Sequence, residues 1–485
     1  MNGRVTFSRI IADHARVDPG RPLVIDADGE LIASELDRAA TSLAHALIRH
    51  GVTIDDTVSV TLPNSRDFII ACTGIWRAGA TPQPISPHLT AEEREQLEHL
   101  SRPVATIGTR PATPGGAWLP SARVAPDASP LPGVAASCWK ASATSGSTGR
   151  PKVVRAAAPA LLDPAQPVAP FLPRIATQLV AGPLWHSAVF TYAFRGLLTG
   201  HQLVLMRRFD PQQWIHLAET HNATWGLLVP TMMARLMNLP PEHRDPARLR
   251  SIERVLHMGA PCPADLKRAF LNWLGPHRVD EVYAGSESNG LTHITGTDWL
   301  AHPGSVGRGI SGTRIRIRDD QGNDLPAGTP GVIWMHRGGT KTYTYQGAES
   351  RRDEQGWDTL ADIGHVDDEG YLYIHDRADD MINRGGEKIA PATIEAALQS
   401  HPDVLEAVAF GVPDEELGQA VHAVVRLLRP DTTPNLLTYA AQRLGPRAPT
   451  AIHVTSEPIR NEAGKLRRRA FAARDLSAGA ECSLG

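Results

Sequence analysis

Residues 144–152 carry the clearest chemical signal in the chain, with the sequence Thr-Ser-Gly-Ser-Thr-Gly-Arg-Pro-Lys. Gly146 and Gly149 allow backbone conformations that other residues avoid, so that several N–H groups can converge on an anion. A stretch rich in Ser, Thr and Gly is also typical of a plain flexible loop. The hydroxyl groups and the lysine charge favour a phosphate-binding loop. Its candidate nucleotide ligands are Thr144, Ser145, Gly146, Ser147, Thr148, Gly149 and Lys152.

Seven further motifs follow this loop in a fixed order. They are Gly259-Ala-Pro261, Tyr283-Ala-Gly-Ser-Glu287, Gly304-Ser-Val-Gly-Arg308, Gly356-Trp-Asp-Thr-Leu-Ala-Asp-Ile-Gly364, Asp376-Arg377, Asn383-Arg-Gly-Gly-Glu-Lys-Ile389 and the segment from Pro458 to Arg469. Over nearly the whole chain, this set resembles the adenylate-forming superfamily of acyl-CoA synthetases, peptide-synthetase adenylation domains and luciferases. The stretches 183–186, 229–236 and 257–262 look most like acyl-CoA ligases for bile acids, steroids and similar bulky acids.

The resemblance implies a reaction that uses ATP, Mg²⁺ and coenzyme A and passes through an acyl-adenylate. Lys465 is implied to stabilise the charge at the α-phosphate, and the alternative is one more lysine in a basic tail. Glu287 is implied to hold Mg²⁺, which prefers oxygen ligands, and the alternative is an ordinary surface glutamate. Asp362 and Arg377 match the positions that bind the ribose hydroxyls, although a surface ion pair would look the same. Around the adenine, the implied contacts are Gly259, Ala260, Pro261, Ala284, Gly285, Ser286 and a stacked Tyr283.

Other positions match the acyl and coenzyme A sides of the superfamily. His186 corresponds to a gate residue beside the acyl pocket, although a histidine next to a tryptophan is as often a packing residue. We expect Trp185, Phe190, Tyr192 and Met232 to line the pocket, with plain core as the alternative for each. In this superfamily the C-terminal domain rotates between the two half-reactions. Asp379 matches the hinge, Gly386 lies beside the pantetheine tunnel, and Lys388 is near a coenzyme A phosphate.

The sequence departs from the superfamily pattern close to the nucleotide. The usual Tyr-Gly-x-Thr-Glu is here Tyr283-Ala284-Gly285-Ser286-Glu287, and the usual Gly-Asp of the ribose motif is Ala361-Asp362. Additional methyl groups in a tight site cost about 1–3 kcal/mol. These changes leave open a protein that adenylates poorly and mainly converts an acyl-adenylate from a partner ligase into its thioester.

The elements that position these motifs follow a βα pattern. A helix is expected over Ser34–Gly51, a strand over Thr57–Leu62 and a further helix ending near Gly79, which favours a parallel sheet covered by helices. Short strand signals return at 202–206 and 226–229, and prolines at 159–173 exclude a long helix there. Beyond residue 305, short strands and turns indicate a barrel-like region. The prediction is an α/β fold: a large N-terminal domain of two βα-layered sheets with a β-barrel-like subdomain, and a small mobile α+β C-terminal domain.

Length and composition set the outer limits of this interpretation. With 485 residues, we expect several domains, at 1–376 and 381–485 with a hinge at 377–380. A net charge of −3 does not indicate nucleic acid or an anionic membrane as a partner. The four cysteines lack metal or disulfide spacing, and the first residues lack a signal-peptide pattern. We therefore expect a cytoplasmic protein, either monomeric or homodimeric.

The expected function is an ATP-dependent acid–CoA ligase for a bulky hydrophobic acid, such as a polycyclic terpenoid or a steroid-like acid. The absence of an aspartate in residues 183–195 argues against an amino acid, whose ammonium group needs a charged partner. Two alternatives remain besides thioester formation alone. The acyl group could be loaded onto a separate carrier protein, or the chain could be a degenerate family member that serves as a binding subunit.

Overall fold

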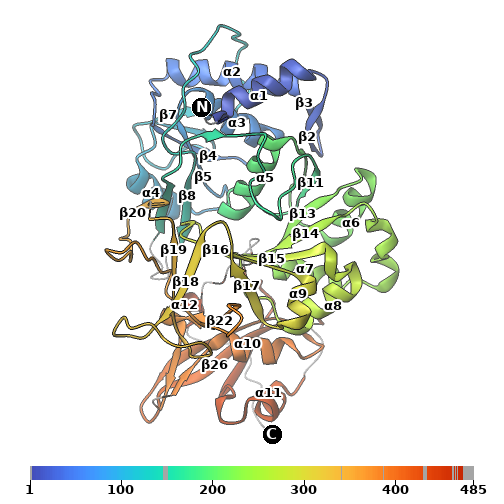
Figure 1. Cartoon of the computed structure of the whole chain (residues 1–485), viewed down its shortest axis with the longest axis vertical. Helices are drawn as coiled ribbons and strands as arrows, with labels where there is room; N and C mark the ends of the chain where they lie inside the picture. Colours follow the sequence, from blue (N-terminus) through green and yellow to red (C-terminus); the bar gives the residue numbers. More distant parts are fainter. Residues whose placement is uncertain are drawn as a thin grey trace.

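The computed structural model describes residues 3–145, 151–339, 341–385, 387–429, 434–460, 464, 466 and 468–472. A larger N-terminal part and a smaller C-terminal part are stacked along the long axis of the molecule (Figure 1). The first helices lie at one end of this axis, and the C-terminal strands and helices lie at the other (Figure 1). The cores of the two parts are separate clusters of buried side chains.

The N-terminal third contains a four-stranded parallel sheet in the order β5-β4-β6-β7. Its strands and the first four helices are β4 (Thr57–Thr61), β5 (Thr81–Pro84), β6 (Ala105–Gly108), β7 (Ala117–Leu119), α1 (Phe7–Val17), α2 (Ala33–Arg49), α3 (Arg66–Arg77) and α4 (Ala91–Ser101). Leu36, Ala40, Leu43 and Leu47 form the buried face of α2, as their spacing predicts. The expected elements at 34–51, at 57–62 and before residue 79 are thus confirmed.

A thirteen-stranded sheet forms the centre of the molecule (Figure 1). Strands β2, β12, β11, β13, β14 and β15 run parallel in this order, and β3 pairs antiparallel with β2 at one edge. The bounds of these strands and their helices are β2 (Pro22–Asp26), β3 (Gly29–Ile32), β11 (Thr177–Val180), β12 (Gln202–Leu205), β13 (Trp225–Leu228), β14 (Arg254–His257), β15 (Val279–Ala284), α5 (Ser187–Thr199), α6 (Pro211–Thr220), α7 (Pro230–Met237), α8 (Ala264–Leu274) and α9 (Gly296–Ala301). The strands predicted at 202–206 and 226–229 are β12 and β13. Both are almost completely buried, as strands covered on both faces must be.

The region that was expected to be barrel-like continues this sheet as antiparallel strands. They are β16 (Leu291–Thr295), β17 (Ser305–Gly309), β18 (Thr313–Arg318), β19 (Gly331–Arg337), β21 (Asp362–Val366) and β22 (Leu372–Arg377). A separate sheet has the order β20-β9-β8 and comprises β8 (Ala141–Ser145), β9 (Pro151–Ala156) and β20 (Tyr343–Gln346). Between the described strands, no ladder joins β18 to β20, so the antiparallel strands form the open end of a sheet and not a closed ring.

The segment 157–176 contains no helix, in agreement with its prolines. It contributes β10 (Leu161–Leu162), which pairs with β1 (Val5–Thr6) beside the first helix. Short 3₁₀ turns complete the described part of the chain at Pro241–His243, Pro246–Leu249, Pro276–Arg278, Ala378–Asp380 and Gly445–Arg447. The turn at Ala378–Asp380 falls within the predicted hinge.

The C-terminal part has its own sheet and helices. They are β23 (Ile382–Arg384), β24 (Glu387–Ile389), β25 (Val404–Asp414), β26 (Gly418–Leu427), β27 (Ala451–Thr455), α10 (Pro391–Gln399), α11 (Leu436–Leu444) and α12 (Arg468–Ala472). Strands β25 and β26 form a long antiparallel hairpin, and β27 pairs parallel with β26. One face of this sheet packs against α10 and α11 through Ile394, Leu398 and Ala440, which are almost fully buried. This is the small α+β domain that the sequence predicts.

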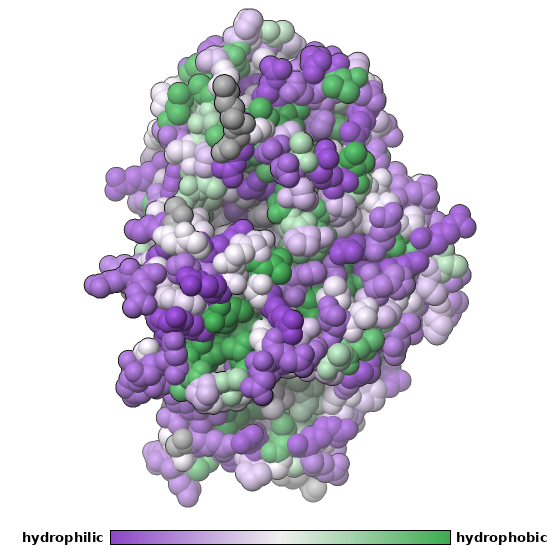
Figure 2. All heavy atoms as spheres, in the orientation of Figure 1, coloured by the Kyte–Doolittle hydropathy of each residue, from purple (hydrophilic) through white to green (hydrophobic). Residues whose placement is uncertain are grey.

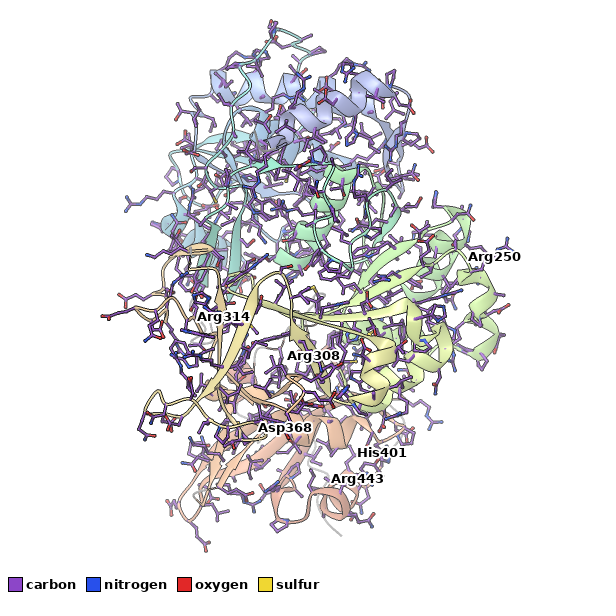
Figure 3. All side chains as sticks on the ribbon, in the orientation of Figure 1. Arg250, Arg308, Arg314, Asp368, His401 and Arg443 are labelled. Carbon is purple, nitrogen blue, oxygen red and sulfur yellow. The ribbon has the colours of Figure 1, made fainter. Side chains whose placement is uncertain are left out.

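The surface is mainly polar. Charged and polar residues cover most of the face in Figure 2, and apolar residues gather near β18 and β22. Arg250, Arg314 and Arg443, which Figure 3 labels, are exposed and lie outside the central cavity described below. In the part of the chain that the structure describes, no helix has the length and apolar character needed to cross a bilayer.

Candidate active site

A cavity of about 2190 Å³ lies where the carboxyl ends of the central parallel strands meet the C-terminal part. Trp185 and His186 after β11, Val229 after β13, Gly259 after β14 and Tyr283 in β15 all line it. Open α/β sheets bind ligands at this edge because their strands end there beside one another. Four of the sequence motifs are therefore brought to one site by the order of the strands.

Glu287 lies in this cavity in contact with Lys152 and Tyr345. Its Oε1 is 3.0 Å from Nζ of Lys152 and 2.6 Å from the hydroxyl of Tyr345, and the side chain is buried. Burial raises the pKa of Glu287, but the charge of Lys152 and these hydrogen bonds outweigh burial and leave the pKa below its usual value. The result is an ionised carboxylate in a buried position, as a Mg²⁺ ligand needs to be.

Tyr283, Asp362 and Arg377 form a second connected group. Strands β21 and β22 pair so that Asp362 is opposite Arg377, and Nε of Arg377 is 3.3 Å from Oδ1 of Asp362. The hydroxyl of Tyr283 donates to the other carboxylate oxygen. Burial, followed by the Asp362 charge, raises the pKa of Tyr283 well above its usual value, so the phenol stays protonated. Asp362 is buried, so this is not an ordinary surface ion pair.

Two glycines lie where the backbone borders the cavity. Gly259 has a φ of +94°, a left-handed conformation that begins the turn through Ala260 and Pro261. A Cβ on Gly285 would lie 2.5 Å from Cδ1 of Leu360 and 2.9 Å from Oε2 of Glu287. These contacts are closer than van der Waals packing allows, so position 285 requires glycine between the strand and the Glu287 carboxylate.

The acyl wall predicted from the sequence is correct in part. Trp185, His186, Tyr192 and Met232 line the cavity. Phe190 does not: the prediction that it lines the pocket is wrong. It is fully buried against Phe194, with ring centroids 4.5 Å apart, and against further aromatic rings of the core. Residues two apart on a helix point about 200° apart, so Tyr192 and Phe190 cannot share one face of α5.

Comparisons with known proteins agree with this geometry. The AMP-binding enzyme model matches residues 11–133 and 143–343, and the model of the AMP-binding enzyme C-terminal domain matches residues 393–465. The chain is 28% identical to 4-coumarate–CoA ligase-like 9 of Oryza sativa subsp. japonica, over 96% of this chain and 92% of that protein. It is 29% identical to sulfoacetate–CoA ligase of Cupriavidus necator, over 96% of each chain. Its fold is similar to that of o-succinylbenzoate CoA synthetase from Bacillus subtilis, with a TM-score of 0.81 at 24% identity, covering 99% of this chain and 100% of that one.

The chain belongs to the AMP-binding enzyme family. It is an ATP-dependent, AMP-forming acid–thiol ligase that makes an acyl-CoA through an acyl-adenylate. Enzymes of this kind use ATP, Mg²⁺ and coenzyme A, and the B. subtilis synthetase has been seen with ATP and a magnesium ion. The buried, ionised Glu287 carboxylate fits the need for a hard oxygen ligand.

The departures from the family motif have different consequences in this AMP-binding enzyme. Ala361 has a φ of +62°, in the left-handed region that glycine tolerates and alanine does not. Its N–H donates to Oγ1 of Thr359, and its carbonyl accepts from the N–H of Ala378, so neighbouring groups fix this conformation. Ala284 and Ser286 both line the cavity, and Ala284 is in the extended backbone of β15. The strain is therefore at Ala361, next to Asp362.

Several predicted residues lie outside the described ones, namely Gly146, Ser147, Thr148, Gly149, Gly386 and Lys465. Only the backbone of Ser145 and Asp379 is described. Thr144 lines the cavity, whereas Lys388 is exposed on β24 and is not part of the cavity wall. Gly464, which precedes Lys465, also lines the cavity, and a Cβ there would lie 3.4 Å from Oγ1 of Thr231. The loop that carries Lys465 thus approaches the start of α7.

The structure also brings in residues that the motif analysis missed. Tyr345 contacts Glu287 from β20, which the sequence alone does not bring close to β15. Lys140 and Arg195 are cationic side chains that line the cavity. A signal existed for Lys140, because a lysine inside the short apolar run 138–141 must be buried if that run is a strand. Arg195 has a weaker signal, at helical spacing from Ser187 and Thr191.

Proposed function

We propose that this ligase activates a bulky, largely hydrophobic carboxylic acid, with polycyclic terpenoid and steroid-like acids as the leading class. The observation that carries this proposal is the wall of the cavity around α5 and α7. Large apolar side chains gather there: Trp185, Tyr192, Met232, Phe171, Leu227 and Met258. A cavity of about 2190 Å³ exceeds the 300–1,000 Å³ of common ligand sites, which leaves space for a nucleotide and a large acyl group together.

The chemistry of the first half-reaction follows from the residues around the cavity. The substrate carboxylate attacks the α-phosphorus of ATP, and pyrophosphate leaves. Glu287 would hold Mg²⁺, and Lys465 would supply positive charge at the α-phosphate. Tyr283 would stack on the adenine, while Asp362 and Arg377 would bind the ribose hydroxyls. The group formed by Tyr283, Asp362 and Arg377 supports this assignment, because its hydrogen bonds hold the three side chains together.

The second half-reaction joins the acyl group to coenzyme A. The thiolate attacks the acyl carbonyl carbon, the bond to the phosphate oxygen breaks, and AMP leaves. We infer that a C-terminal domain at 381–485 rotates about a hinge at 377–380 between the two steps. His186 would then guard the acyl pocket, and Gly386 and Lys388 would meet the incoming coenzyme A. The 3₁₀ turn at Ala378–Asp380 supports the hinge, since it separates the two sheets.

A second candidate is a member that performs only the thioester step on an acyl-adenylate from a partner ligase. The strained Ala361 favours this candidate, because it precedes the carboxylate that would bind the ribose. Two assays separate the candidates. One offers a steroid-like or terpenoid acid with ATP, Mg²⁺ and coenzyme A, and the other offers its synthetic acyl-adenylate with coenzyme A alone. Thioester in both supports the complete ligase, whereas thioester from the adenylate alone supports the second candidate.

The same assays test the remaining alternatives. Replacing coenzyme A with a phosphopantetheinylated carrier protein asks whether a carrier is the acceptor. A Lys465→Ala variant that leaves thioester output in cells unchanged would support a binding subunit without catalysis. A cytoplasmic location and a monomeric or homodimeric state stay predictions, which fractionation of cells and light scattering would test.

A further inference from the structure

Lys140 is a buried cation at the wall of the cavity. It directly precedes β8, its residue is 4% exposed, and its ammonium group donates to Oγ of Ser187 and Oγ1 of Thr191, each at 2.7 Å. These partners are neutral hydroxyl groups. The nearest carboxylate on the nucleotide side, Glu287, already accepts hydrogen bonds from Lys152 and Tyr345. Lys140 therefore has hydrogen-bond partners but no neutralising charge.

Arg195 adds a second cation on the same side of α5. Ser187, Thr191 and Arg195 are four residues apart, so they lie along one face of the helix, and all three line the cavity. The Arg195 guanidinium is 4.7 Å from the centroid of the Trp139 ring, and the Lys140 ammonium is 5.1 Å from it. Two positive charges thus share one tryptophan. In the part of the chain that the structure describes, neither forms an ion pair with a carboxylate.

Such an arrangement is costly in the free enzyme. Buried charges are normally paired, because removal from water is not offset by neutral partners alone. Burial, with the charge of Arg195 next in importance, lowers the pKa of Lys140 to about 7. Burial also lowers the pKa of Arg195 to about 10. A pair of buried cations facing a ligand cavity is suited to a ligand that brings the missing negative charge.

We propose that Lys140 and Arg195 bind a second anionic group of the acid substrate, at a distance from the carboxylate that is activated. The substrate class is a dianionic acid whose apolar middle lies against the wall around Tyr192 and Met232. This inference rests on the proposed function in one respect, namely that the cavity holds the acid. The Ser187 hydroxyl can still donate its own proton to that anionic group while it accepts from Lys140.

The test compares matched pairs of acids. The probes are α,ω-dicarboxylic acids of six to sixteen carbons and the monocarboxylic acids of equal length, each assayed for thioester formation with ATP, Mg²⁺ and coenzyme A. We expect at least one diacid to exceed its monoacid about 10- to 100-fold in kcat/KM, as for a charge-assisted hydrogen bond. Lys140→Met and Arg195→Met should each remove this preference while the monoacid rate stays within about threefold. Arg250→Met, at an exposed position outside the cavity, should keep it.

Two results would overturn the anion site. One is a preference for the monoacid at every length in the wild type, and the other is an unchanged diacid preference in both variants. Turnover of none of these acids would count against the proposed acid class only. Calorimetry then decides the anion site separately: heat on titrating a diacid, lost in Lys140→Met, supports it, and equal heats for diacid and monoacid refute it. Thr191→Val, which removes one hydroxyl without a charge, should weaken diacid binding less than Lys140→Met does.

Discussion

Replacing Lys140 with methionine should change how the stability of the enzyme depends on pH. Methionine has a similar length and no charge, so the substitution removes the cation and keeps most of the packing. The groups that act on the Lys140 charge are Arg195, which lowers its pKa, and Cys138 and Glu287, which raise it. Burial is the largest influence, and it lowers the pKa from 10.5 to about 7. This fall corresponds to on the order of 5 kcal/mol between the two protonation states.

The sign follows from the protons bound by each state. Between pH 7 and pH 9 the unfolded chain keeps the Lys140 proton, because its pKa there is about 10.5, whereas the folded protein releases it. The unfolded state therefore binds more protons, and stability rises with pH in this window. For a folded-state pKa of about 7, the rise from this one group is about 2 kcal/mol between pH 7 and pH 9. The methionine variant lacks this contribution.

Urea unfolding at pH 7 and pH 9 measures the effect directly. The difference in unfolding free energy between Lys140→Met and the wild type should shift by about 2 kcal/mol toward the wild type as the pH rises. Lys388→Met is the matched control, because Lys388 is exposed and its variant should follow the wild-type profile. Parallel profiles for Lys140→Met and the wild type would show that Lys140 is not a desolvated cation. The argument for an anion site would then lose its electrostatic basis.

Three further outcomes are expected. Gly285→Ala should lower the rate of pyrophosphate release about 10- to 100-fold, because the added Cβ meets Leu360 and Glu287; an unchanged rate would show that the strand yields. Glu287→Gln should lower pyrophosphate release about 100-fold or more and spare thioester formation from a synthetic acyl-adenylate; equal losses in both assays would exclude a role specific to ATP and Mg²⁺. Ala361→Gly should raise the free energy of unfolding by about 0.5–1 kcal/mol, since glycine relieves the left-handed strain at a small entropic cost; a fall in a urea titration would contradict that strain.

The sequence predicts the βα elements well because their signals are local. The helical spacing in α2 and the short apolar runs of β4, β12 and β13 each indicate one buried face or strand without knowledge of the neighbours. The barrel-like region was harder to predict. Short strands with turns are typical of a barrel and equally of an open antiparallel extension, and only long-range pairing such as that of β17 with β22 distinguishes them.

The candidate site shows the same division between local and long-range information. Motifs that end parallel strands converge because the order of the strands brings them to one edge, and Glu287 and Lys152 meet as their charges suggest. Phe190 failed because pocket and core residues alternate within α5, and its composition alone does not show which face points inward. Tyr345 and Arg195 escaped notice because their roles come from contacts between segments far apart in sequence.

The described arrangement of the two parts suits the first half-reaction. Asp376, on β22, accepts a hydrogen bond from the backbone N–H of Ala392 in α10, at 2.8 Å. Arg468 lies 2.7 Å from Asp380 in the proposed hinge and 2.6 Å from Glu395 in α10. These contacts cross or adjoin the hinge, and they hold the segment around Gly464 against Thr231. A rotation that moves the 383–389 loop to the site must break the Asp376 bond, so the enzyme can alternate between half-reactions only if coenzyme A binding compensates for that loss.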